Sequence, residues 1–297
     1  VQKAGDAPAG VAAGVVPTAI GQGTPVSIRS SDPLTRWDEA NVVRGTAKGT
    51  VSAIAYARLG DITSANFRAL ASVQQELGAT VRLTNRQNVA FRDLTEEQLP
   101  KLFARLDAIG MAEPGAELSR DVVACPGADT CNLAVTQSRG LADAISARLE
   151  EEGLAEVGGV RTNISGCTNS CGQHHIADIG FSGAERRAHG QSAPGYTMLL
   201  GGYVGQERIE FGDKAMRLPA KNGPEAVIRV VRRFADERTV GETFRSWMER
   251  SGGARGVVAE TLKELDFFPT PEEAPEMFVD WDEITPFDVS LGASECA

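Results

Sequence analysis

Hydrophobic and polar residues alternate with regular periods between residues 34 and 112, and this pattern predicts a small unit of strands and helices. Residues 51–58 alternate as a β-strand does. Apolar side chains then recur at helical spacing over residues 64–77. Thr63 supplies an N-cap for that helix and Gly78 a stop, so both of its ends are predicted as well.

The same unit continues with two short strands and a second helix. Strands are predicted over residues 80–85 and 88–92. The sequence Thr95-Glu-Glu-Gln98 has the form of a capping box and predicts a helix that runs to about residue 109. The resulting order βαββα is typical of a ferredoxin-like half-unit.

From residue 117 onward, strand and helix patterns alternate and predict a second, larger α/β domain. Its predicted strands cover residues 119–124, 160–165, 176–181 and 196–204, and its predicted helices cover residues 133–150, 225–237, 241–249 and 257–265. Residues 1–33 are rich in Ala, Gly, Val, Pro and Ser without either period. The chain therefore divides into a linker-like arm (1–33), a ferredoxin-like half-domain (34–112) and a larger domain (113–297), and its fold class is α+β.

The net negative charge of the chain is concentrated at its C-terminal end. The segment from Glu264 to Ala297 holds ten of the forty acidic residues and none of the thirty basic ones, so residues 1–263 carry thirty of each. An acidic tail on a balanced body argues against a nucleic-acid partner. The chain is 42% hydrophobic but has no apolar run long enough to cross a bilayer, so no membrane association is predicted.

Five cysteines suggest a reducing compartment, and a cytoplasmic location is expected. Four of them form two close pairs, Cys125-Pro-Gly-Ala-Asp-Thr-Cys131 and Cys167-Thr-Asn-Ser-Cys171, with 35 residues between the inner members. Soft thiolate ligands suit zinc and iron–sulfur clusters. The spacings C-x5-C and C-x3-C differ from the usual zinc-finger and bacterial ferredoxin spacings, although a structural zinc site remains open. Cys296 has no partner in this pattern.

The residues around these cysteines carry a specific resemblance. The segments Val123-Ala-Cys-Pro-Gly-Ala-Asp-Thr-Cys-Asn-Leu-Ala134 and Asn163-Ile-Ser-Gly-Cys-Thr-Asn-Ser-Cys-Gly-Gln-His174 resemble the signature of the siroheme- and [4Fe-4S]-dependent nitrite and sulfite reductases. The resemblance implies that the larger domain is an α/β siroheme/iron–sulfur domain. It also implies a [4Fe-4S] cluster whose ligands are Cys125, Cys131, Cys167 and Cys171, with Cys171 also bridging to the siroheme iron.

Three further positions follow from the same resemblance. The stretch Arg82-Leu-Thr-Asn-Arg-Gln-Asn88 is similar to a sequence that occurs on the sheets around siroheme in this family. Siroheme carries eight carboxylates, and arginine suits them, so Arg82 and Arg86 are expected to bind the cofactor. Spacing alone favours an ordinary solvated sheet face for this stretch, and the resemblance is what favours the cofactor role. Asn169 matches an asparagine beside the siroheme, and its alternative role is that of a turn residue.

The resemblance implies that this chain is the cluster-bearing C-terminal half of a reductase, partnered by an N-terminal half. The implied reaction is the six-electron reduction of nitrite to ammonium or of sulfite to sulfide, with electrons from a ferredoxin or a flavoprotein. Two other interpretations remain open: an iron–sulfur electron carrier or accessory subunit without siroheme, and a zinc-stabilised structural domain. His174 and His175 follow the second cysteine pair, and strand alternation would turn at most one of them toward a cofactor.

Overall fold

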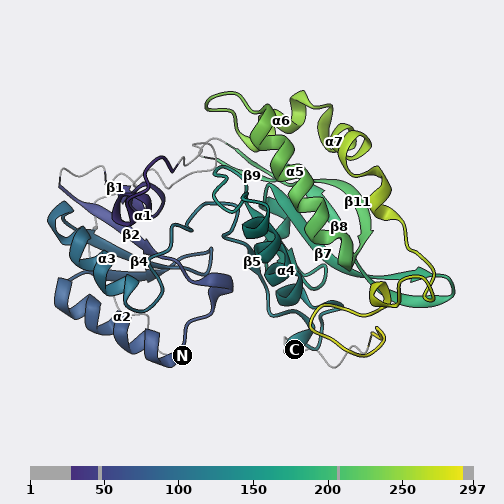
Figure 1. Ribbon diagram of the computed structural model, residues 1–297, viewed down its shortest axis with the longest axis horizontal. Helices are drawn as coiled ribbons and strands as arrows, with labels where there is room; N and C mark the ends of the chain where they lie inside the picture. The colour runs from purple at the N-terminus through teal and green to yellow at the C-terminus, as the bar shows by residue number, and fades with distance from the viewer. Residues whose placement is uncertain (1–27, 46–48, 206–207, 290–297) are drawn as a thin grey trace, which may run out of the picture.

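The computed structural model describes residues 28–45, 49–205 and 208–289. These residues form two units, a smaller N-terminal one and a larger C-terminal one, each with its own hydrophobic core (Figure 1).

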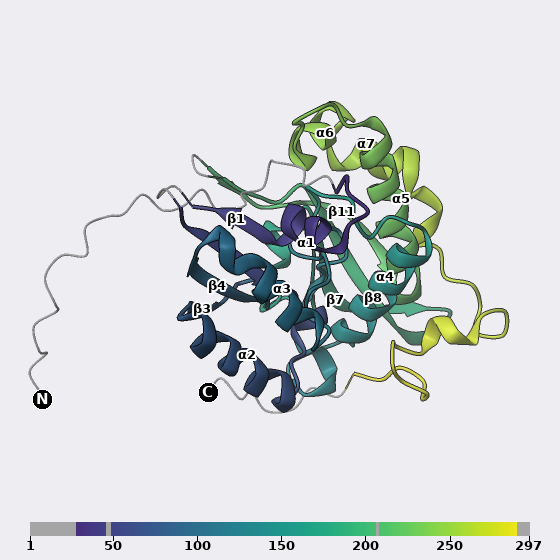
Figure 2. The same cartoon turned by 60° about the vertical axis from the view of Figure 1, so that its left-hand side comes forward.

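The smaller unit is a four-stranded antiparallel sheet with helices against one face (Figure 2). The strand order is β1-β2-β4-β3. The strands are β1 (Val42–Arg44), β2 (Val51–Ala55), β3 (Thr80–Leu83) and β4 (Val89–Leu94), and the helices are α1 (Pro33–Asn41), α2 (Ser64–Leu77) and α3 (Leu99–Asp107).

Local sequence signals set the helix ends in this unit, as predicted. The Thr63 hydroxyl accepts a hydrogen bond from Asn66 N at 3.1 Å, and Gly78 ends α2 in a left-handed conformation. Thr95 and Gln98 form the expected capping box. The sequence pattern missed α1 and β1, so the unit has one more strand and one more helix than expected. Asp32, whose side chain caps α1 ahead of Pro33, was the available signal. Of the predicted linker-like arm, residues 1–27 lie outside the described residues.

The larger unit is built on a mixed five-stranded sheet in the order β11-β8-β7-β6-β5. Strands β5, β6 and β7 are parallel, whereas β8 and β11 are antiparallel to their neighbours. The strands are β5 (Val123–Ala124), β6 (Thr162–Ser165), β7 (Ile179–Ala188), β8 (Gln191–Leu200) and β11 (Asp213–Pro219), and β9 (Tyr203–Val204) and β10 (Ile209–Glu210) form a separate hairpin.

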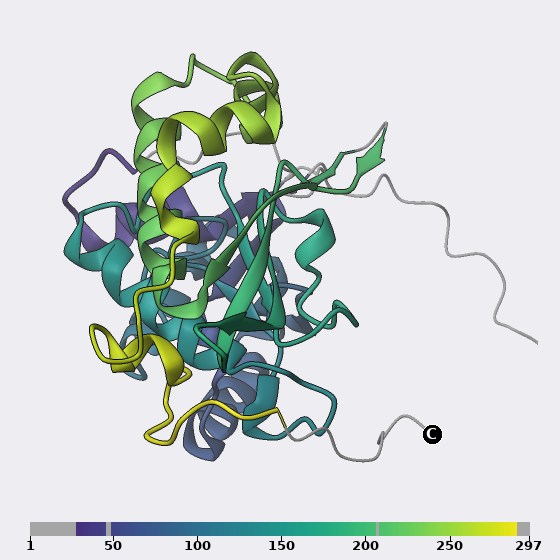
Figure 3. The same ribbon diagram turned by 90° about the vertical axis from the view of Figure 1, so that its right-hand side faces the viewer.

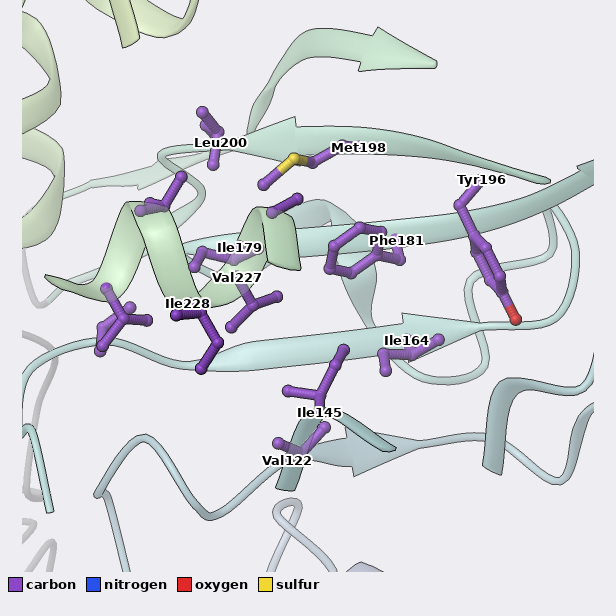
Figure 4. Close-up of a cluster of buried hydrophobic side chains, with 14 of the residues drawn as sticks. Val122, Ile145, Ile164, Ile179, Phe181, Tyr196, Met198, Leu200, Val227 and Ile228 are labelled. Carbon is purple, nitrogen blue, oxygen red and sulfur yellow. The ribbon is translucent and has the colours of Figure 1, made fainter. Parts of the chain in front are cut away.

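Helices close the core of this sheet. Figure 4 shows Ile145 and Val227 pointing toward Ile164, Ile179 and Phe181 of the sheet, and all five side chains are fully buried. Each such burial contributes about 1.5–3 kcal/mol. The helices of the unit are α4 (Ser138–Glu151), α5 (Gly223–Glu237), α6 (Phe244–Arg250) and α7 (Gly253–Thr261). None of the helices in the described part of the chain has the length and apolar character that a bilayer span requires.

Three predicted elements next to the cysteines were wrong at their starts. The strand expected over residues 119–124 begins at Val123. The helix expected over residues 133–150 begins at Ser138, because Val135 and Thr136 donate their backbone N–H groups to Gly166 O instead of starting a helix. The strand expected over residues 176–181 begins at Ile179, and it is preceded by a short 3-10 turn, η4 (His174–Ile176).

Parts of the acidic C-terminal segment are buried. We call residues 266–289 the C-terminal strap (yellow in Figure 3). Phe268 and Phe278 pack with Ala193 in a small third core. Asp280 is buried, and its carboxylate accepts a hydrogen bond from Gln137 N at 2.9 Å. Gln137 immediately precedes α4, so the strap caps the helix that follows the first cysteine pair.

Replacing Asp280 should therefore loosen the start of α4. We expect Asp280→Ala to lower the free energy of unfolding by about 1–2 kcal/mol, because Gln137 N loses its acceptor. Urea denaturation measures the change. Glu272→Ala, in the same strap but exposed, is the control and should be neutral. Equal stability of Asp280→Ala and the wild type would contradict this role for the strap.

Candidate metal centre

The parallel part of the larger sheet brings the two cysteine pairs together. Cys125 directly follows β5, and Cys167 follows the adjacent strand β6 after one glycine, Gly166. Since β5 and β6 run parallel, their carboxyl ends lie at the same edge of the sheet. The two cysteine-bearing loops therefore start side by side.

Gly166 is the direct contact between the loops. Its N–H donates to Cys125 Sγ at 3.2 Å, and its carbonyl accepts from Val135 N at 2.8 Å and Thr136 N at 3.1 Å. A Cβ at this position would lie 2.7 Å from Thr136 O and 3.0 Å from Gly127 Cα, so only glycine permits this approach. This contact fixes the position of the Cys125 sulfur relative to the second loop, as a shared set of metal ligands requires.

The first residue of α4 holds Cys125 from the other side. Ser138 Oγ donates to Cys125 O at 2.8 Å and lies 3.3 Å from Cys125 Sγ. Gly127 passes beside this serine with φ +68°, and a Cβ there would be 2.6 Å from Ser138 N. Because α4 begins only at Ser138, it is Cys125 that contacts the start of this helix.

The four cysteines differ in exposure, and none of them is in a disulfide. Cys125 is buried, Cys131 and Cys167 are half-buried, and Cys171 is exposed. Within the described residues, no three His, Cys, Asp or Glu side chains converge as they would around a single metal ion. A cubane cluster takes each of its thiolates at a separate iron, and the two adjoining loops carry four thiols.

The two histidines brace the second cysteine loop. His174 is buried, and its Nδ1 lies 2.8 Å from Ser165 Oγ, which also accepts a hydrogen bond from Gly172 N. His175 Nδ1 lies 2.8 Å from Ser170 Oγ, within the loop itself. The two rings are 4.1 Å apart between centroids. They sit on η4, not in a strand, so the argument from strand alternation does not apply to them.

The remaining predicted site residues are placed very differently from one another. Asn169 is exposed in the loop between Cys167 and Cys171. Arg82 is exposed on β3, where it donates to Val81 O at 2.9 Å. Arg86 is buried, and its Nε lies 2.8 Å from Asp121 Oδ2 and 3.7 Å from Glu117 Oε1. The structure brings Asn169 to the cysteines, whereas Arg86 already pairs with carboxylates of the chain; the siroheme assignments of all three stay predictions.

The acidic partners of Arg86 belong to a buried group of charges that the sequence analysis did not single out. Burial raises the pKa of Glu117, and the positive charge of Arg86 opposes the rise. Burial also raises the pKa of Asp178, to about 6, while Arg161 holds the rise in check through a 2.9 Å bond from its backbone N–H. In the sequence, the position of Glu117 and Asp178 next to predicted strands was the feature that could have indicated this buried group.

Three arginines of α5 are paired with glutamates in the structure. Arg232 contacts Glu152 at 2.6 Å, and Arg233 contacts Glu237 at 2.8 Å and Glu260 at 2.6 Å. Arg229 also pairs with two glutamates, Glu225 and Glu264. Charge neutralised in this way gives little long-range attraction, so this face is an ordinary solvated one.

His174 should leave a pH signature. Burial, and next to it the charge of His175, lowers the pKa of His174 from 6.5 to about 4. The stability that the neutral imidazole contributes is therefore complete above pH 6.5 and is lost as the pH falls through about 4. We expect the difference in free energy of unfolding between wild type and His174→Gln to shrink over that range in urea denaturation. A difference that stays constant from pH 7 to pH 4 would contradict the shift, and His189→Gln is the matched control.

The chain matches two protein-family models. Residues 115–258 match the model described as the nitrite and sulphite reductase 4Fe-4S domain, and residues 44–109 match the nitrite/sulfite reductase ferredoxin-like half domain. The first match contains all four cysteines. The two matches also confirm the predicted fold class.

Individual relatives are of two kinds. The chain is 33% identical over 223 residues to an assimilatory ferredoxin-dependent nitrite reductase of Haloferax mediterranei, covering 74% of this chain and 37% of that protein. It is 31% identical over 201 residues to a ferredoxin-type sulfite reductase of Mycobacterium tuberculosis, covering 65% of this chain and 36% of that protein. The chain thus spans little more than a third of the length of these relatives.

A solved structure agrees with these matches. The structure of the Mycobacterium tuberculosis NirA protein superposes with a TM-score of 0.58 at 29% identity, over 71% of this chain and 40% of that one. The two family models, these relatives and this fold together show that the chain belongs to the nitrite and sulfite reductase family.

Proposed function

We propose that this chain is the cluster-bearing half of a reductase that converts nitrite to ammonium or sulfite to sulfide. The observation that carries the proposal is the contact between Gly166 N and Cys125 Sγ, which joins the two cysteine pairs at one edge of the sheet. Nitrogen passes from +3 to −3, and sulfur from +4 to −2, so either reaction consumes six electrons. Relatives of both kinds match the chain, so the proposal covers both anions.

Family membership implies a [4Fe-4S] cluster and siroheme, and the cysteines fit the first of these. Cys125, Cys131 and Cys167 would hold three corners of the cluster from buried and half-buried positions. Cys171, the exposed cysteine, would hold the fourth and face the siroheme. When bound, the cluster and siroheme supply the one-electron carriers and the iron at which the anion is reduced.

The chain's own residues prepare this site in three ways. The Gly166 N–H donates to Cys125 Sγ and fixes the position of this sulfur. His174 and His175 order the loop that carries Cys171 through their contacts with Ser165 and Ser170. Asn169 is placed in this loop, and Arg82 is exposed on β3, where it could meet a siroheme carboxylate.

The activity also requires partners that supply the rest of the site and the electrons. An N-terminal half would complete the siroheme pocket, since the chain covers 37% and 36% of its two reductase relatives. Electrons would come from a ferredoxin, which the names of both relatives specify, or from a flavoprotein. A cytoplasmic setting would keep the thiols reduced.

Removal of any one cluster ligand should abolish the cluster. We expect Cys125→Ser, Cys131→Ser and Cys167→Ser each to lose most of the iron and acid-labile sulfide, because each change leaves one cluster iron without its thiolate ligand. Iron and sulfide analysis of anaerobically purified protein measures the loss. Cys296→Ser is the control and should keep both. A variant of the first three that keeps full cluster content would disprove that residue's assignment as a ligand.

A further inference from the structure

The turn that joins β3 to β4 reaches from the smaller unit to β5, the strand that leads to Cys125. This turn, residues 84–88, contains the last five residues of the Arg82–Asn88 stretch. Gln87 Nε2 donates to Ala124 O at 2.8 Å. Ala124 is the last residue of β5 and immediately precedes Cys125.

Arg86 and Asn88 hold a second point on the same segment, Asp121. Arg86 Nε lies 2.8 Å from Asp121 Oδ2, and the guanidinium also donates to the Asp121 carbonyl. Asn88 Nδ2 lies 3.2 Å from each carboxylate oxygen of Asp121. Only 7%, 1% and 3% of Arg86, Asn88 and Asp121 are exposed, so these bonds are made away from water, where losing one partner is costly.

The turn itself is held rigid. Thr84 Oγ1 accepts from Asn88 N at 3.1 Å, and Asn88 Oδ1 accepts from Ala57 N at 2.8 Å. Gln87 has φ +63°, a left-handed conformation that is unfavourable for a residue other than glycine. Such strain persists only where surrounding bonds enforce it, and it often marks a functional segment.

We propose that this turn is a positioning element for Cys125, acting from the smaller unit through Asp121 and Ala124. Cys125 N donates to Ile164 O at 3.1 Å, so β5 also sets the register of Cys125 against β6, which leads to Cys167. A shift of β5 would therefore move one cluster ligand relative to another. The inference rests on the proposed function, in which these cysteines hold a cluster.

Arg86 takes a different role here from the one that the resemblance implies. Its guanidinium is already matched by Asp121 and by Glu117, at 3.7 Å. Burial with these two carboxylates leaves it little exposed surface for an outside anion. Arg86 is thus a positioning residue that acts through Asp121, and not a contact for siroheme carboxylates.

The test compares Arg86→Gln, Asp121→Asn and the double variant, purified anaerobically from cells that make siroheme. We expect each single variant to release cluster iron to a chelator about 10-fold faster than the wild type, the scale seen when a supporting partner of a metal ligand is lost. The double variant should be no faster than the worse single one, because both changes break the same contact. The electron paramagnetic resonance signal of the reduced cluster should shift in all three.

Arg44→Gln is the matched control. Arg44 lies in the same unit, is exposed, and pairs with Asp38 at 2.8 Å and with Glu96 at 3.1 Å, so it tests the loss of an arginine–carboxylate contact away from the cysteines. Its iron release and its resonance signal should match those of the wild type. Folded Arg86→Gln and Asp121→Asn proteins with wild-type release rates and signals would overturn the proposal, since a purely stabilising contact predicts that result.

Two further outcomes distinguish this proposal from direct cofactor binding by Arg86 and from a failure of the proposed function. Loss of siroheme with an intact cluster in Arg86→Gln, but not in Asp121→Asn, would overturn it in favour of direct cofactor binding by Arg86. A wild-type protein without iron and sulfide would refute the proposed function itself. If the Arg86 and Asp121 variants fail to fold, Gln87→Ala decides: it removes only the bond to Ala124, and an unchanged resonance signal would overturn the proposal.

Discussion

The hydrogen bond from Gly166 N to Cys125 Sγ is the contact on which the rest of the site depends. It exists because β5 and β6 are parallel neighbours, so the residues that follow them emerge at one edge of the sheet. Glycine at 166 lets two backbones approach to a distance that a side chain would forbid. Four thiols separated by long stretches of sequence thereby lie in two adjoining loops, and a cluster can be held without a dedicated fold of its own.

Three other parts of the chain support the same edge. The C-terminal strap caps α4 through Asp280, the histidine pair braces the loop before Cys171, and the turn at residues 84–88 holds the segment that ends at Cys125. These supporting contacts come from both units, so the smaller unit contributes contacts to the candidate metal centre. A buried Arg86–Asp121 pair adds little net stability compared with apolar packing, but it fixes a geometry, which is what a ligand set requires.

Local signals predicted much of this structure, and long-range contacts account for what they missed. The ends of α2 and the capping box at Thr95 depend on neighbouring residues only, and both were predicted correctly. The helix predicted from residue 133 starts only at Ser138, because Val135 and Thr136 donate their backbone N–H groups to Gly166, which is far away in sequence. The cysteine pairs themselves were recognisable from their spacing and flanking residues. The burial of Arg86 against Asp121 was not, because the sequence pattern could not show which groups would face each other across two units.

The central claim is that the two cysteine pairs together hold one [4Fe-4S] cluster. The most direct measurement is the iron, sulfide and zinc content of the anaerobically purified chain, read together with the resonance signal after reduction. Our account predicts about four cluster irons and four sulfides per chain, little zinc, and a signal typical of a reduced [4Fe-4S] cluster. A colourless protein that contains stoichiometric zinc and no acid-labile sulfide would contradict it.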